Sequence, residues 1–234
     1  MRNRKIITQQ RADLNGGGIP ESIRLTGIQE ADSAAWQEIR LEIQDGATCQ
    51  KTVLTPQEDV GYDPRLWIGR LTEANNPQML LSIQSGGSGG IGYYTIYGWA
   101  DGQYLPLFTS DAYNAEFSYT VNYLDGYTVE AVSLENRMKY LIDLSGRDEA
   151  YLSQIYRPDG ALIKPITGGV NPLSVLYPVD FDGDGQYELL AYQRITGLYN
   201  ADGLGDFINL LGWDGGRFAL ISQSVGIFGT DAAQ

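Results

Sequence analysis

The sequence of 234 residues contains no histidine and one cysteine, Cys49. A chain without histidine cannot build a Ser-His-Asp or Cys-His catalytic site, nor a histidine-ligated metal centre. A single cysteine excludes an intrachain disulfide. The sequence therefore predicts no catalytic residue, and enzymatic activity is the less favoured alternative.

Positive charge and long apolar runs are also scarce. The chain has 16 Lys and Arg against 29 Asp and Glu, a net charge of −13, and a pI near 4.3. Nucleic-acid binding requires a basic surface, so we expect no nucleic-acid partner. No stretch approaches the ~20 apolar residues of a membrane helix, so no membrane insertion is expected. The basic first residues precede no apolar run of signal-peptide length.

Glycine, by contrast, is abundant. The 29 Gly and 9 Pro separate short segments rich in Tyr, Leu, Ile and Val, which is typical of many short strands joined by turns. Ile39, Leu41 and Ile43 alternate with polar residues, as on a half-buried strand. Residues 31–40 also suit a short helix, but the repeat described next favours strand there.

Two landmarks recur with a similar period. Asp-Gly pairs begin at Asp45, Asp101, Asp159 and Asp214, spaced 56, 58 and 55 residues apart. Asp-Gly between apolar runs predicts a hairpin turn. Polar residues that open apolar strands recur 57, 52 and 58 residues apart, at Glu21, Gln78, Glu130 and Glu188. Together they predict one all-β, β-propeller-like domain over 1–234, with four repeats of about four antiparallel strands at 6–56, 61–114, 115–165 and 166–225.

The fourth repeat contains a candidate calcium loop. Asp180, Asp182 and Asp184 occupy alternate positions, separated by Gly183 and Gly185. Calcium prefers six to eight oxygen ligands, and the carbonyl of Gln186 and the carboxylate of Glu188 extend the predicted set. A bound cation would also relieve the repulsion among the carboxylates. The alternative is a metal-free surface turn.

The segment from Val179 to Leu190 resembles the D-x-D-G-D-G-x-x-[DE]-[LI] signature of FG-GAP/VCBS-type repeats. This resemblance implies an integrin-like β-propeller of a secreted or surface protein. The first repeat has a similar loop, with Asp13, Asn15 and Glu21 as ligands of a weaker second metal site. Gly17 replaces the third acidic residue there, so that site is expected to be weakened or empty. The second and third repeats have no recognisable loop.

Calcium loops with dissociation constants of ~0.1–1 mM suit the outside of a cell. We therefore expect an extracellular or cell-envelope location, with the export signal removed. The expected function is a non-catalytic module that binds protein or carbohydrate. The alternative is a polysaccharide-active lyase or hydrolase that uses carboxylates.

An aromatic cluster offers a candidate ligand site. Tyr93, Tyr94 and Trp99 follow a glycine-rich segment and could form a platform for a sugar, although packing between strands explains them as well. The glycine-rich segment itself, from Ser85 to Gly92, lacks the Gly-Lys-Ser/Thr ending of a phosphate loop and is interpreted as a hairpin connection.

Overall fold

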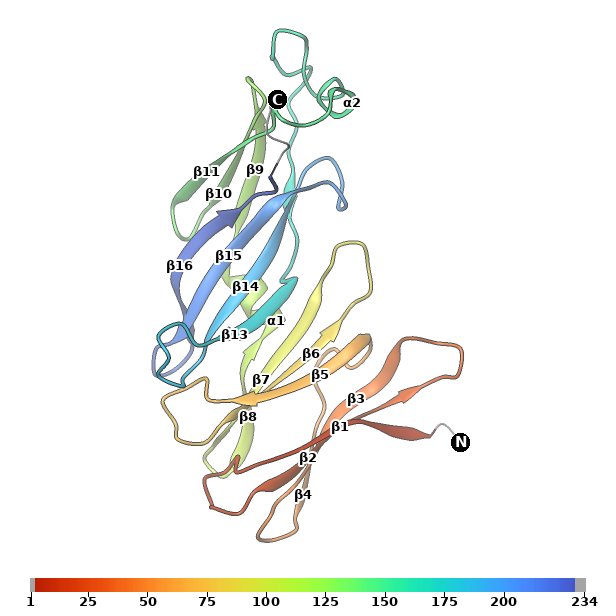
Figure 1. The fold of residues 1–234 in the computed structure, drawn as a ribbon, viewed down its shortest axis with the longest axis vertical. Helices are drawn as coiled ribbons and strands as arrows, with labels where there is room; N and C mark the ends of the chain where they lie inside the picture. Colours follow the sequence, from red (N-terminus) through yellow and green to blue (C-terminus); the bar gives the residue numbers. More distant parts are fainter. Residues whose placement is uncertain (1–2, 230–234) are drawn as a thin grey trace.

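A computed structural model describes residues 3–229, so the ends of the predicted domain, 1–2 and 230–234, lie outside it. The described chain is almost entirely β-structure (Figure 1). Neither of its two short helices is long and apolar enough to cross a membrane. The elements are β1 (Arg4–Ala12), β2 (Glu21–Gln29), β3 (Trp36–Gln44), β4 (Lys51–Leu54), β5 (Tyr62–Gly69), β6 (Gln78–Gln84), β7 (Gly92–Ala100), β8 (Gln103–Thr109), α1 (Ser110–Glu116), β9 (Tyr119–Leu124), β10 (Thr128–Ser133), β11 (Met138–Asp143), α2 (Glu149–Leu152), β12 (Gly169–Val170), β13 (Val175–Val179), β14 (Glu188–Thr196), β15 (Gly203–Trp213) and β16 (Phe218–Gly226).

These strands form four antiparallel sheets, each built from one continuous stretch of chain. The first sheet is β1–β4, the second β5–β8, and the third β9–β11, while the fourth has the order β12-β14-β15-β16 with β13 also paired to β14. One of the sheets is curled into a half-barrel. The expected all-β class is confirmed. The expected four strands per repeat are present in the first and second sheets, whereas the third has three strands and the fourth five.

Asp-Gly turns shape most of the expected hairpins. Asp101 and Gly102 connect β7 to β8 with φ values of 52° and 78°, a left-handed pair that favours glycine at the second position. The Asp45 and Asp214 pairs lie in the β3–β4 and β15–β16 connections. The pair at Asp159 also forms a turn, in which the nitrogen of Gly160 donates to the carbonyl of Arg157 at 2.9 Å. This turn lies between Tyr156 and Leu162, which pair as an isolated antiparallel bridge, and it connects no two strands of a sheet.

The four sheets are stacked rather than arranged around an axis (Figure 1). One hydrophobic cluster joins the first sheet to the second through residues such as Leu41 and Met79. Another joins the second sheet to the fourth, and a third joins the fourth sheet to the third, with Phe207 at its centre. The order in space is therefore first, second, fourth, third, because the long strands β14 and β15 contribute to two cores. The radial order expected of a propeller is not shown.

A polar layer separates the two cores that share the fourth sheet. Gln193 and Asn209 are fully buried on β14 and β15. Gln193 accepts hydrogen bonds from the hydroxyls of Tyr113 and Tyr119 at 3.2 and 2.8 Å, and Asn209 donates to Tyr113 at 2.6 Å. Tyr113 lies in α1, just before the third sheet, and Tyr119 is the first residue of β9. The network therefore connects the third sheet to the fourth.

Candidate functional site

The loop between β13 and β14 brings three carboxylates together. One oxygen each of Asp180, Asp182 and Asp184 lies within 4.8 Å of the others. Asp180 is half-buried, and the other two are exposed. Such a spacing lets one hard cation contact all three groups. Sequence reasoning predicted this set, and the folded loop places its three aspartates in one cluster.

Hydrogen bonds within the loop hold the aspartates in place. Asp180 accepts from the nitrogens of Gly183 and Gly185 at 2.8 and 3.1 Å. Both glycines have positive φ, 76° and 80°, which aims these nitrogens inward. Asp184 accepts from the nitrogen of Gln186 at 2.6 Å. Each carboxylate keeps lone pairs that the loop does not use, so the cluster can still bind a cation.

The same loop design recurs in three of the four sheets. In each, a backbone nitrogen donates to the side chain seven residues later, at the start of the next strand. The pairs are Leu14 to Glu21 at 2.6 Å, Leu71 to Gln78 at 2.7 Å, and Phe181 to Glu188 at 3.3 Å. This recurrence explains the period of the polar strand openings. It also assigns Glu188 a structural contact in addition to its predicted role as a ligand.

In the first-sheet loop, the amide of Asn15 connects two carboxylates. The Nδ2 of Asn15 donates to Glu21 at 2.8 Å and to Asp45 at 3.0 Å. Glu21 is fully buried, and one oxygen of Asp13 is buried without a hydrogen-bond partner. Asn15 therefore lies between the carboxylates of Glu21 and Asp45. Asp13, Asn15 and Glu21 belong to one loop, as predicted, but they form no cluster of three carboxylates.

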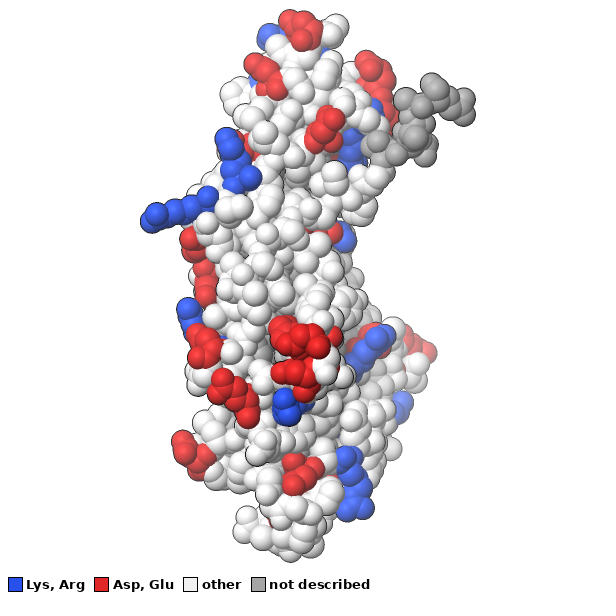
Figure 2. Space-filling model, turned by 60° about the vertical axis from the view of Figure 1, so that its left-hand side comes forward, with Lys and Arg blue, Asp and Glu red and all other residues white. Residues whose placement is uncertain are grey.

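The three loops lie next to one another along the stack. The side chain of Asn76 donates to the carbonyl of Leu14 at 2.6 Å, linking the second-sheet loop to the first-sheet loop. The nitrogen of Tyr187 donates to the carbonyl of Arg70 at 2.7 Å, linking the fourth to the second. Figure 2, which turns this side of the molecule forward, shows acidic side chains gathered there. The carboxylate loop is thus anchored to the neighbouring sheet.

A groove of about 520 Å³ opens between the second and fourth sheets, beside this loop. Its walls are β5–β7 on one side and β13 on the other. Trp67, Tyr94 and Tyr177 supply aromatic surface, and Tyr177 is 56% exposed. Polar groups line it too, including Ser82 and Gln84. Rings combined with hydrogen-bonding groups are typical of small-ligand sites.

A bulge in β5 places an ion pair at this groove. The pairing register with β6 shifts between Tyr62 and Arg65, and Asp63 has a φ of 47°. A non-glycine residue in this left-handed region is strained, and bulges of this kind re-aim side chains. Arg65 and Asp63 form an ion pair, and the hydrogen bond and negative charge of Asp63 raise the pKa of Arg65.

The three predicted ligand aromatics do not form one platform. Tyr94 lines the groove, and its hydroxyl donates to the carbonyl of Ser174 at 3.0 Å. Its neighbour Tyr93 packs in the core between the first and second sheets. Trp99 lies at the far end of β7, edge-on to Tyr104 with ring centroids 4.8 Å apart. Sequence reasoning missed Trp67 and Tyr177, because only the packing of the second sheet against the fourth places them in one groove.

The fold and site define an all-β protein of stacked antiparallel sheets with a carboxylate loop at the junction of two of them. The YybI C-terminal domain family matches residues 117–226, which include that loop. The uncharacterized protein YybI of Bacillus subtilis (strain 168) is 42% identical over 229 residues, covering 98% of this chain and 87% of that protein. The chain belongs to the YybI family. No solved structure matches it significantly.

This family assignment corrects the resemblance to FG-GAP/VCBS repeats, which was wrong. The matching family and the relative are both YybI, and no FG-GAP/VCBS family is found. The physical reason is that alternating aspartates and glycines describe a local loop, whatever sheet carries it. The signature covered Val179–Leu190, too short a stretch to specify how four sheets pack.

Proposed function

We propose that this protein is a calcium-binding, non-catalytic module that binds a protein or carbohydrate ligand in the groove between the second and fourth sheets. Calcium would bind at Asp180, Asp182 and Asp184, with the carbonyl of Gln186 and the carboxylate of Glu188 as further oxygen ligands. The observation that carries the proposal is the convergence of the three aspartates within 4.8 Å. Calcium favours such oxygen clusters.

The loop is connected to the groove at both ends, which supports a link between metal and ligand. β13 forms one wall of the groove and leads directly into Asp180. At the other end, Tyr187 packs edge-on against Trp67 of the opposite wall, with ring centroids 5.1 Å apart. A cation that fixes the loop would therefore fix both walls. Calcium is expected to strengthen ligand binding by reducing the entropy lost on binding.

The charged groups of the groove favour binding over catalysis. Asp63 is the one carboxylate among its described lining residues, and Arg65 pairs with it. Carboxylate-based hydrolysis of a glycoside requires two such groups on either side of the bond. The groove thus offers recognition by rings, an ion pair, the amide of Gln84 and the hydroxyl of Ser82, and we assign it no reaction.

The proposed calcium site also motivates a location. Loops of this kind bind calcium at ~0.1–1 mM, a range met outside cells. We therefore propose an extracellular or cell-envelope location, which fractionation of cells that express the protein would test. Recovery of the protein from the cytosol alone would contradict it.

Thermal unfolding with calcium, magnesium or chelator tests the metal site. With calcium at ~100 times the dissociation constant, the gain is about 2.7 kcal/mol. For a chain of this size, that corresponds to a midpoint rise of about 5–11 °C. Asp182→Asn should abolish the rise. Asp214→Asn is the matched control, because Asp214 caps a hairpin turn with similar hydrogen bonds but belongs to no carboxylate cluster among the described residues. An equal response to chelator and calcium would refute the site.

A further inference from the structure

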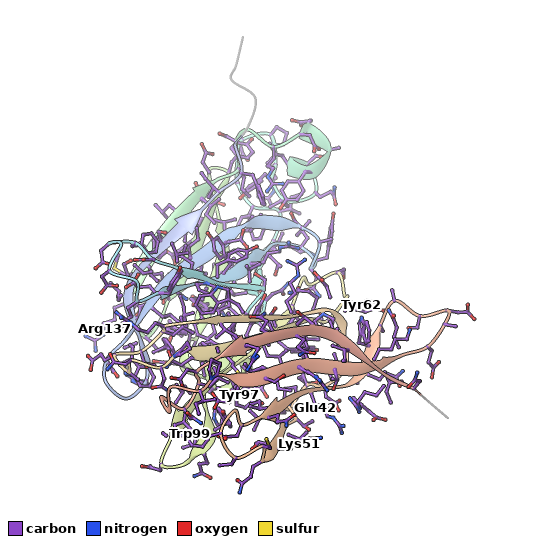
Figure 3. The ribbon with its side chains drawn as sticks, turned by 60° about the horizontal axis from the view of Figure 1, so that its bottom comes forward. Glu42, Lys51, Tyr62, Tyr97, Trp99 and Arg137 are labelled. Atoms are coloured by element: carbon purple, nitrogen blue, oxygen red, sulfur yellow. The ribbon has the colours of Figure 1, made fainter. Side chains whose placement is uncertain are left out.

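The outer face of the first sheet is unlike the rest of this acidic protein. Its inner face carries Ile23, Leu25, Leu41 and Ile43, which are buried against the second sheet. Because side chains alternate along a strand, the intervening residues face outward. The register places them in two rows across the sheet: Arg11, Ser22, Gln44 and Lys51 in one, and Gln9, Arg24, Glu42 and Val53 in the other. Figure 3 shows Glu42 and Lys51 on this outer side.

Most of the charge on this face is positive and unpaired. Arg40 is neutralised by Glu42, with Nε and Nη2 at 2.9 and 2.6 Å from one carboxylate oxygen. Arg11 and Lys51 make no ion pair among the described residues, and Arg24 bonds only to the amide oxygen of Gln9 at 3.2 Å. Three cations therefore remain free on one face of a chain whose net charge is −13.

These cations surround a continuous furrow. One hollow of about 210 Å³ is lined by Arg24, Arg40 and Lys51 among others. A second of about 300 Å³ is lined by Arg11 and Gln9 and also by Asp45, whose carboxylate accepts hydrogen bonds from Ala47, Thr48 and Asn15. The two hollows share Ser22 and Gln44, so they form one depression across the four strands. Amide and hydroxyl groups lie between the cations along its length.

We propose that this furrow binds a linear polysaccharide that carries carboxylates. An arginine fork matches the geometry of a carboxylate. Arg11, Arg24 and Lys51 belong to β1, β2 and β4, and neighbouring strands lie about 5 Å apart, so a chain crossing the sheet meets the three cations in sequence, with β3 between the last two. Gln9, Ser22 and Gln44 can bond to sugar hydroxyls. Nucleic acid is disfavoured because single strands are bound by stacking bases on aromatic rings. The one aromatic residue of 4–54, Trp36, packs in the core instead.

The surface is separate from the carboxylate loop and from the groove beside it. The furrow is lined entirely by β1–β4 and their connections, whereas the groove is lined by β5–β7 and β13. Its binding should therefore be independent of calcium. Failure of the calcium proposal and failure of this one can be observed in separate measurements.

The test is binding of fluorescent polygalacturonate by anisotropy, in chelator, so that calcium neither fills the loop nor bridges the polymer. The wild-type protein should bind at about 50 mM salt and lose affinity on raising salt to about 200 mM. The triple variant Arg11→Gln, Arg24→Gln, Lys51→Gln should bind about tenfold or more weakly, since each exposed charge pair contributes a modest amount. Neutral dextran should not bind.

The matched control removes three exposed cations outside the furrow, with the substitutions Arg137→Gln, Arg157→Gln and Lys164→Gln. Its net charge equals that of the furrow triple variant. It should bind polygalacturonate within about twofold of wild type. Equal losses in both triple variants, or no binding by wild type, would overturn the proposal. Tighter binding of polyphosphate or single-stranded DNA than of polygalacturonate would also overturn it. If the furrow triple variant does not fold, the single variant Arg24→Glu gives the same comparison.

Discussion

Replacing Gln78 with alanine should destabilise the protein more than the equivalent replacement of Glu188. The side chain of Gln78 is 2% exposed, and its Oε1 accepts from the nitrogens of Leu71 and Thr72 at 2.7 and 3.1 Å. Both donors belong to buried residues. An unsatisfied buried donor costs about 1–3 kcal/mol, so losing this acceptor should lower the free energy of unfolding by about 2–4 kcal/mol.

Urea unfolding at equilibrium, in chelator, measures this loss. Gln78→Glu keeps an acceptor for both nitrogens but buries a charge and loses the bond that the side-chain nitrogen donates to the carbonyl of Asn76 at 2.7 Å, so it should restore only part of the stability. Glu188→Ala removes the equivalent acceptor from the exposed fourth-sheet loop, where its contact with Phe181 is longer, at 3.3 Å, and should cost less than about 1 kcal/mol. If Gln78→Ala were no more destabilising than Glu188→Ala, burial would not be what makes this bond important, and the argument would be refuted.

Three further predictions concern the cores, a turn and alkaline pH. Phe207→Ala should cost about 3–5 kcal/mol in urea unfolding, because the ring is fully buried and stacks on Tyr119. Gly46→Ala should lower the thermal midpoint, since its Cβ would lie 2.5 and 2.7 Å from two backbone carbonyl oxygens; an unchanged midpoint would contradict this contact. Burial raises the pKa of Tyr119, Tyr123 and Tyr156 to about 12 from 10, so the stability they contribute is complete below pH 10 and is lost as the pH rises towards 12. Tyrosine absorbance should show these groups ionising near pH 12 in the folded protein and near pH 10 after unfolding in urea.

The strand pattern was accessible from the sequence because it depends on local signals. Three of the four predicted strand openings begin strands at the predicted residue, Glu21, Gln78 and Glu188. The fourth failed because Glu130 lies inside β10, whose hairpin turn is formed by Asp125 and Gly126 rather than by a distant Asp-Gly pair. Both turns carry the same dipeptide, Asp-Gly, so no local signal distinguishes one from the other.

The candidate groove could not be predicted. Trp67 and Tyr177 are far apart in the sequence, and neither belongs to a motif. They meet because the fourth sheet packs against the second, which in turn depends on Leu80, Leu176 and Leu189 sharing one core. Contacts between residues so far apart in the sequence depend on how whole sheets pack, and no local sequence pattern predicts them.

The amino-acid sequence by itself determined the all-β class, most of the hairpins and the carboxylate loop, because alternation, turn chemistry and the spacing of aspartates act over a few residues. Only the tertiary structure decided that the sheets stack in the order first, second, fourth, third. The long strands β14 and β15 have one apolar face that covers two cores, with Leu189 and Leu211 in one and Ile195 and Phe207 in the other. A regular repeat period is compatible with repeats arranged in a ring or in a stack. Which arrangement forms depends on which sheet faces pack against each other.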